Sequence, residues 1–141
     1  MNRTDDPELT AKIEALARAD RRYRADAYFF LIRALAFASR ELARRPESDH
    51  VDGKALLEGF RRLALREFGP LTLQVLEDWG LHRTEDIGNL VFALAEQGVL
   101  GVESDDRRAD FADGYDFRRA FCEPFVCDLW PGQEPEPLRL A

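Results

Sequence analysis

Cysteine is scarce in this chain, and long hydrophobic runs are missing from it. Only Cys122 and Cys127 are present, which excludes the disulfide framework of small secreted proteins and favours a reducing cytoplasm. The most apolar stretch, residues 25–38, is shorter than the ~20 residues of a membrane span and contains Arg33. Residues 1–10 contain no apolar core of a signal peptide. We therefore expect a cytoplasmic protein that does not associate with a membrane.

The chain also carries more acidic than basic side chains. Its 141 residues include 27 acidic and 20 basic side chains, which give a formal net charge of -7 at pH 7. Averaged over the surface, this charge repels nucleic acid and anionic lipid. The length is that of one ordinary domain, and a hydrophobic fraction of 45% is sufficient for a buried core. One acidic domain that folds alone is the expectation.

The spacing of apolar residues predicts a mainly α-helical protein. Apolar positions three and four apart run through residues 26–45, where Tyr28, Leu31 and Leu35 share one side, so this segment is expected to be the long core helix. Similar stripes predict further helices at residues 7–19, 53–68, 70–79, 84–97 and 117–121.

Local signals mark the ends of these helices. Side chains that accept hydrogen bonds from a helix N-terminus are expected to cap three of them: Asp52, Thr84 and Asp116. Glycines are expected to end three of them: Gly69, Gly80 and Gly98. Glu85 and Asp86 are predicted in the first turn of the helix at residues 84–97, where the helix dipole favours negative charge.

A β-hairpin is expected after the helix at residues 84–97. Residues 99–103 are predicted to form a strand and residues 104–110 a turn. Apolar and acidic positions partly alternate in residues 111–117, which predicts a return strand. Three helices followed by a hairpin is the order of a winged-helix module, so residues 53–117 are predicted to form a winged-helix-like unit.

Three regions are expected along the chain. Residues 1–24 are predicted to form a charged N-terminal helix or arm, residues 25–125 a single helical domain, and residues 126–141 a Pro-rich C-terminal tail. The predicted fold is therefore mainly α, with a long core helix packed on a winged-helix-like helical unit that carries a small β-hairpin.

The helix at residues 84–97 takes the place of a DNA-recognition helix, yet it contains no lysine or arginine. A DNA reader offers arginine, lysine, asparagine or glutamine to the bases, with cations beside the phosphates. The outer positions of this helix are expected to be mostly acidic: Glu85, Asp86, Asn89, Glu96 and Gln97. We therefore predict that this face docks another protein of basic character, and a solvated face without a partner is the alternative.

The most acidic window of the chain lies in residues 103–117. Its predicted partner-binding residues combine acids with aromatic rings: Asp105, Asp106, Asp110, Phe111, Asp113 and Tyr115. The spacing of the acids does not match a calcium-binding loop, so no metal or other cofactor is assigned. Three interpretations stay open: a weak magnesium or calcium site, a peptide-binding lip, and a hydrated turn whose aromatic side chains pack on the core.

An arginine cluster supports a second function class, nucleic-acid binding. Four arginines lie near the join of the first two predicted helices, with two tyrosines beside them: Arg18, Arg21, Arg22, Arg24, Tyr23 and Tyr28. Arginines and aromatic rings together bind RNA through phosphate contacts and stacking. The alternative is that these arginines are solvated or paired with nearby acids.

A small metal-dependent enzyme is the third function class. Cys122 and Cys127 are five positions apart, unlike the closely spaced pairs of zinc sites, and His50 and His82 are distant in sequence. The sequence contains no nucleophile elbow, no phosphate-binding glycine loop and no paired metal histidines. It therefore assigns no catalytic residue, and whether these four side chains converge in space stays open.

A set of short motifs runs through the second half of the chain: Phe68-Gly69-Pro70, Val75-Leu76, Trp79-Gly80, Thr84-Glu85-Asp86-Ile87-Gly88, Val91-Phe92 and Gly98-Val99-Leu100, followed by Asp106, Asp110-Phe111, Asp116-Phe117 and Phe121. This set resembles a conserved bacterial family of unassigned function, known mainly from planctomycete and verrucomicrobial genomes. The resemblance covers residues 28–125. It implies no activity and no catalytic residue.

Overall fold

The computed structural model describes residues 6–42, 51–100 and 108–126. These residues form helices and no β-strand, so the prediction of a mainly α-helical protein is confirmed. None of these helices is long and apolar enough to cross a bilayer. The elements in chain order are α1 (Pro7–Ala19), α2 (Ala25–Glu41), α3 (Gly53–Phe68), the 3-10 helix η1 (Gly69–Leu71), α4 (Thr72–Asp78), α5 (Thr84–Glu96), the 3-10 helix η2 (Arg108–Phe111), α6 (Phe117–Phe121) and α7 (Glu123–Val126).

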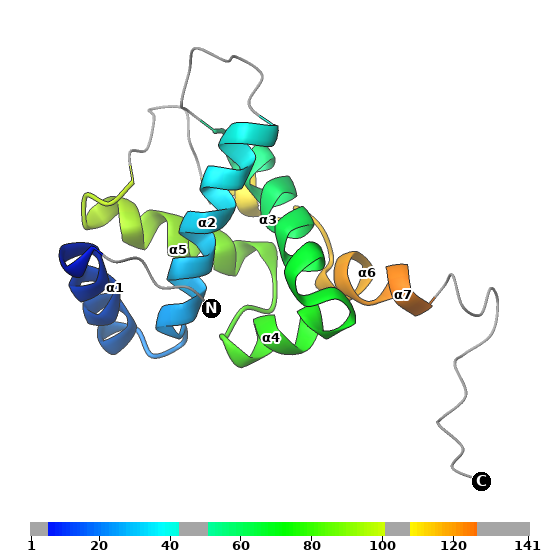
Figure 1. Cartoon of the computed structure of the whole chain (residues 1–141), viewed down its shortest axis with the longest axis horizontal. Coiled ribbons are helices and arrows are strands. Elements are labelled where there is room, and N and C mark those ends of the chain that lie inside the picture. Colours follow the sequence, from blue (N-terminus) through cyan, green and yellow to red (C-terminus); the bar gives the residue numbers. More distant parts are fainter. Residues whose placement is uncertain (1–5, 43–50, 101–107, 127–141) are drawn as a thin grey trace, which may run out of the picture.

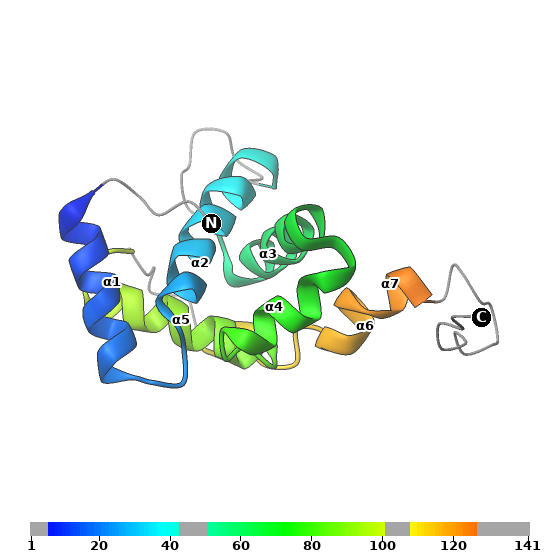
Figure 2. The same cartoon turned by 60° about the horizontal axis from the view of Figure 1, so that its bottom comes forward.

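Helices α2 and α3 form the centre of the molecule (Figure 1), with α1 towards one end and α6 and α7 towards the other (Figure 2). The two central helices approach closely at one point. A Cβ atom added to Gly59 would lie 2.7 Å from the Cβ of Ala38, so only glycine fits at this contact without a shift of its neighbours. This close approach lets the apolar faces of both helices exclude water.

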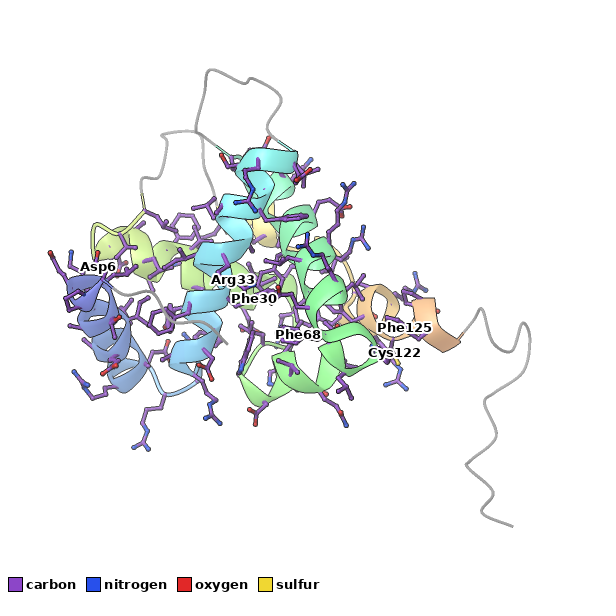
Figure 3. All side chains as sticks on the ribbon, viewed as in Figure 1. Asp6, Phe30, Arg33, Phe68, Cys122 and Phe125 are labelled. Carbon is purple, nitrogen blue, oxygen red and sulfur yellow. The ribbon has the colours of Figure 1, made fainter. Side chains whose placement is uncertain are left out.

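Four aromatic rings fill the space between α2, α3 and the end of α4. Phe30 is completely buried and lies at their centre, with its ring centroid 5.1 Å from that of Phe60 and 5.5 Å from those of Phe68 and Trp79. The Phe30–Phe60 pair is edge-to-face, the geometry that the ring quadrupoles favour. Figure 3 shows the labelled Phe30 and Phe68 on the neighbouring helices α2 and α3.

Helix α1 is part of the same core. Ile13, near the middle of α1, is completely buried and belongs to one apolar cluster with Phe30 of α2 and Phe121 of α6. The segment predicted as a charged N-terminal arm therefore packs on the core along its helical part. Its N-terminus is capped by Asp6, whose carboxylate accepts a hydrogen bond of 3.0 Å from the backbone N–H of Glu8.

Two of the three predicted N-caps are confirmed, and the third is wrong. Asp52 accepts a hydrogen bond of 2.7 Å from the N–H of Ala55, and Asp116 accepts one of 3.0 Å from the N–H of Arg119. Thr84 is instead the first residue of α5 and is buried, while Arg83 occupies the cap position. The Thr84 hydroxyl bonds to the segment after η2, so it is not available to the helix N-terminus.

Gly80 and Gly98 end α4 and α5 as predicted, and both have positive φ angles, 92° and 74°. After each glycine the next N–H bonds back into the helix, from Leu81 to the carbonyl of Leu76 and from Val99 to that of Leu94. This is the Schellman arrangement, which satisfies the last carbonyl groups of a helix. The prediction that Gly69 ends α3 is also confirmed, with a φ of 52°.

The predicted β-hairpin is not seen in the described residues. The return strand at residues 111–117 is wrong, since Phe111 ends η2, Asp113 has a φ of 51° and Phe117 begins α6. The partial alternation arose because aromatic residues of two separate short helices happen to be spaced like strand positions. Of the other strand, Val99 and Leu100 form a bend, and residues 101–103 lie outside the described ranges.

Replacing Gly80 by alanine is expected to destabilise the fold strongly, and the same change at Gly98 is expected to be mild. Both positions have positive φ, which costs an L-residue about 1 kcal/mol. A Cβ at Gly80 would also overlap the carbonyl oxygen of Arg22, whereas a Cβ at Gly98 meets no atom within 4 Å. Urea unfolding should show a loss of about 1 kcal/mol for Gly98→Ala and about 3 kcal/mol or more for Gly80→Ala. Equal losses would contradict the close contact at Gly80.

Candidate functional site

The predicted docking face of α5 is largely engaged inside the protein. The hydroxyl of Tyr23, in the link between α1 and α2, donates a hydrogen bond of 2.6 Å to the carboxylate of Asp86. The same hydroxyl accepts one of 2.9 Å from the side-chain amide of Asn89. The carboxylate of Asp86 also accepts bonds from the backbone N–H groups of His82 and Arg83, at 2.9 and 3.2 Å. Asp86 thus stabilises the start of α5 and ties it to the link.

Asn89 continues this network towards η2. Its side-chain oxygen accepts a hydrogen bond of 2.8 Å from Arg108, whose guanidinium lies 4.8 Å from the ring centroid of Phe92. Asp86 and Asn89 therefore differ from the prediction, because their polar groups are satisfied within the fold. Of the five residues predicted on this face, Glu96 and Gln97 are exposed and Glu85 is half-buried.

The predicted residues of the acidic window separate into three groups. Asp105 and Asp106 lie outside the described residues. Phe111 is buried and packs edge-to-face on Phe92, as the interpretation of a turn pinned to the core expects. Three others come together on one surface: Asp110, Asp113 and Tyr115.

These three residues line a groove of about 610 Å³ between α3 and a facing segment at residues 109–115, which includes most of η2 and the turn after it. We call it the acidic groove. Its lining consists of Lys54, Leu57 and Glu58 from α3, and of Ala109, Asp110, Ala112, Asp113, Gly114 and Tyr115 from the facing segment. The α3 residues precede the facing residues by about fifty positions, so periodicity along either segment gives no signal that they meet.

Tyr115 forms the floor contact between the two walls of the acidic groove. Its hydroxyl donates a hydrogen bond of 2.9 Å to the backbone carbonyl of Leu57. Its ring packs edge-to-face on Phe121 with centroids 5.8 Å apart. Burial raises the pKa of Tyr115, so the phenol stays protonated and keeps donating at neutral pH.

Glu58 belongs to an ion cluster at the rim of the acidic groove. Arg61 and Arg62, one turn later on α3, donate hydrogen bonds of 2.6 and 2.8 Å to its carboxylate. The bond from Arg61, helped by that from Arg62, lowers the pKa of Glu58 from 4.5 to about 2, although partial burial opposes the shift. Glu58 is therefore ionised at neutral pH, and its charge is balanced locally.

A second hollow, of about 300 Å³, lies on the other side of the turn at residues 112–115. Its lining consists of His82, Arg83, Glu85, Asp113, Tyr115, Asp116 and Phe117. The turn between the two hollows is fixed by Thr84, whose hydroxyl donates to the carbonyl of Phe111 at 2.5 Å and accepts from the N–H of Gly114 at 3.0 Å. One buried hydroxyl thus fixes the turn at residues 112–115. We call this turn the ridge, because it lies between the acidic groove and the second hollow.

Acids outnumber bases around this ridge. The acidic side chains that line the two hollows are Glu58, Glu85, Asp110, Asp113 and Asp116, and the basic ones are Lys54 and Arg83. With Arg61 and Arg62 at the rim included, five acids face four bases. The local potential is therefore negative, which attracts cationic side chains.

The predicted arginine cluster is exposed, but the structure does not combine it with free aromatic rings. Tyr23 is only 3% exposed and Tyr28 only 1%, so neither ring is available to stack on a base. Arg22 forms an ion pair of 2.8 Å with Asp20, and the Arg24 guanidinium lies 3.5 Å from the carboxylate of Asp78. Arg18 and Arg21 are exposed. The alternative of solvated or paired arginines fits these positions.

The four side chains considered for zinc are only partly within the described residues. His82 is exposed in the link before α5, and Cys122 is a half-buried free thiol after α6. His50 and Cys127 lie outside the described ranges, so their convergence is untested. In the described part of the chain, no three or more His, Cys, Asp or Glu side chains are grouped as a metal ion would require.

Comparisons of the chain with protein-family models, with curated proteins and with solved structures find no match. The case for function therefore depends on the geometry of the surface and on its charge.

Removal of the Tyr23 hydroxyl is expected to destabilise the fold, because Asp86 and Asn89 share it as their common partner. Tyr23→Phe should lower the free energy of unfolding by about 2 kcal/mol, the cost of leaving partly buried polar groups unpaired. Arg22→Gln next to it serves as the matched control and should cost less than about 1 kcal/mol, since the Arg22–Asp20 pair is exposed. Urea unfolding measures both, and equal losses would contradict the role of the hydroxyl.

The ion cluster around Glu58 predicts a pH-dependent contribution to stability. A carboxyl whose pKa is lowered on folding stabilises the protein fully above its unfolded value of 4.5, and this contribution disappears as the pH falls towards about 2. Because 34% of the Glu58 side chain is exposed, we expect only about 1 kcal/mol at neutral pH. Urea unfolding of the wild type and Glu58→Gln should therefore differ at pH 7 and converge as the pH falls below 4.5. A difference that does not change with pH would show that the cluster does not hold in solution.

Proposed function

We propose that this protein is a non-catalytic docking module that binds a basic segment of another protein at the acidic groove. The observation that supports it is the groove of about 610 Å³ lined by Asp110, Asp113 and Tyr115. Its walls belong to different parts of the chain and are joined by the bond from Tyr115 to Leu57, so the shape exists before a partner binds. A preformed surface lowers the entropic cost of binding, because the groove does not have to be ordered when the partner binds.

The docking surface is shifted from the one that the sequence predicted. Asp86 and Asn89 of α5 are engaged by Tyr23 and Arg108, so they contribute to stability instead of contact. Asp110, Asp113 and Tyr115 keep the role predicted for them, and α3 supplies the opposite wall with Lys54 and other residues.

The chemistry of the groove favours arginine or lysine side chains in an extended segment. Their charged ends fit beside the carboxylates of Asp110 and Asp113, while their aliphatic stems can lie over the apolar parts of Leu57 and Tyr115. Exposed charge pairs contribute up to about 1 kcal/mol each. Such a site predicts transient binding in the range of about 1 µM to 1 mM, with selectivity set by charge.

The winged-helix-like arrangement of residues 53–117 is not confirmed, since residues 111–117 do not form the return strand of its wing. Two further expectations remain predictions, a cytoplasmic location and membership of the conserved bacterial family that the motifs resemble.

A basic probe tests the docking function. A short fluorescent oligo-arginine peptide should bind the full chain, measured by fluorescence anisotropy, and an oligo-glutamate peptide should not. The triple variant Glu85→Gln, Asp110→Asn, Asp113→Asn removes three charges around the ridge and should weaken binding by about 10-fold or more, which equals about 1.4 kcal/mol.

The matched control removes the same number of charges elsewhere, with Glu8→Gln, Glu41→Gln and Glu77→Gln on α1, α2 and α4. Because both triple variants have the same net charge, nonspecific attraction is equal in the two. Weakening by less than about 2-fold in the control supports the acidic groove. Equal weakening in both variants would show that only the overall charge matters and would overturn the proposal.

A further inference from the structure

A third hollow, of opposite charge, lies between α2 and α3. It has a volume of about 190 Å³ and is lined by Arg33, Ala36, Phe37, Arg40, Leu63, Arg66 and Glu67. Arg33 and Glu67 form an ion pair of 2.6 Å across the two helices, which fixes one side of the hollow. Arg40 and Arg66 are exposed. We call this surface the arginine hollow, and with three arginines and one glutamate it is positive within an acidic protein.

The arginine hollow and the acidic groove use opposite faces of α3. Successive residues of an α-helix are rotated by about 100°. The α3 residues of the acidic groove are Lys54, Leu57 and Glu58, and those of the arginine hollow are Leu63, Arg66 and Glu67. With this rotation, the mean directions of the two sets around the helix axis differ by about 180°. Figure 1 agrees, since η2 lies behind α2 and α3 in this view, while Figure 3 shows the labelled Arg33 at the front of α2.

We propose that the arginine hollow is the basic surface that the acidic groove recognises, so that a second copy of this chain is the docking partner. This inference rests on the proposed docking function and names its partner. The two linings have opposite charge. Glu58 is balanced by Arg61 and Arg62, and Glu67 is paired with Arg33, which leaves Asp110, Asp113 and Lys54 in the groove and Arg40 and Arg66 in the hollow. Arg40 and Arg66 of one copy reach the carboxylates of Asp110 and Asp113 of the next.

The placement of the two surfaces decides the geometry of assembly. In a two-fold dimer, each copy presents the same face to the other, so surfaces on opposite faces of α3 cannot both be used. The contact is therefore head-to-tail. A head-to-tail assembly of any length has an open groove at one end and an open hollow at the other, so further copies can add. The net charge of -7 opposes growth at long range, but physiological salt screens it beyond about 8 Å, whereas the contact pairs act at shorter distance.

Sedimentation velocity of the full chain at physiological salt tests this. The weight-average sedimentation coefficient should rise continuously with protein concentration between about 10 µM and 1 mM, the range of weak complexes. A single species of monomer mass over the whole range, or a discrete dimer that does not grow further, would overturn the proposal.

Charge variants identify the surfaces. Asp110→Asn with Asp113→Asn neutralises the groove and keeps the side-chain shapes, and Arg40→Glu with Arg66→Glu reverses the hollow. Each double variant alone should remain monomeric. Mixed together they should form a 1:1 complex that grows no further, because one variant keeps an intact hollow and the other an intact groove. The control Arg18→Glu with Arg21→Glu has the same charge change as the hollow variant and should assemble like the wild type. A mixture that stays monomeric would overturn the contact.

The oligo-arginine titration separates the failure of this inference from the failure of the proposed function. If the wild type binds the peptide at the acidic groove but sediments as a monomer at all concentrations, the docking function is supported and the second copy is excluded as its partner. If it neither binds the peptide nor self-associates, both proposals are overturned.

Discussion

The packing of Phe30 is the constraint on which the rest of the arrangement depends. Its ring contacts Phe60, Phe68 and Trp79, so it fixes α2, α3 and the end of α4 relative to one another. The position of Trp79 then determines the course of the chain on both sides. Its carbonyl accepts a hydrogen bond of 3.1 Å from the N–H of Arg24, and the following residue, Gly80, passes directly beneath the carbonyl of Arg22. An apolar contact in the core thereby places the α1–α2 link where Tyr23 reaches the start of α5.

Several polar side chains in this protein join segments that are distant in sequence. Tyr23 and Asp86 are 63 positions apart, Tyr115 and Leu57 58, and Thr84 and Gly114 30. Each of these bonds ties a connecting segment to a helix, α5 or α3. No buried side-chain nitrogen or oxygen of the described residues lacks a hydrogen-bond partner, so the cost of burying these groups is offset within the fold. Polar groups that form these internal bonds are not available to a partner, so only the other surface groups can bind one.

Much of the helical framework could be predicted from the sequence, because helices are signalled by nearby residues. The stripe through Tyr28 and Leu31, the Asp52 cap and the Gly80 stop are all local features, and all three are found in the structure. Thr84 does not cap α5, because its hydroxyl is hydrogen-bonded to the backbone of Phe111 and Gly114. Asp86 has the composition of a surface acid, and only the position of Tyr23 shows that it is engaged.

Only one of the two walls of the acidic groove could be predicted from the sequence. Its acidic wall was accessible to sequence analysis as a local concentration of Asp residues around Asp113. The opposite wall on α3 was not, since Lys54 and Glu58 belong to an ordinary solvated helix face until tertiary structure brings Tyr115 against Leu57.

The long separations of the polar bonds also bear on the order in which the protein assembles. Helices α2 and α3 are neighbours in the chain, so their contacts close a short loop and can form early, whereas the bond from Tyr115 to Leu57 has to close a loop of 58 residues. We expect the α2–α3 hairpin to act as the folding nucleus and the wall carrying η2 and α6 to dock afterwards. The arginine hollow would then exist before the acidic groove does, so a nascent chain presents its basic surface first. Under the proposed head-to-tail contact, a folded copy binds this surface before the acidic groove of the nascent chain has formed.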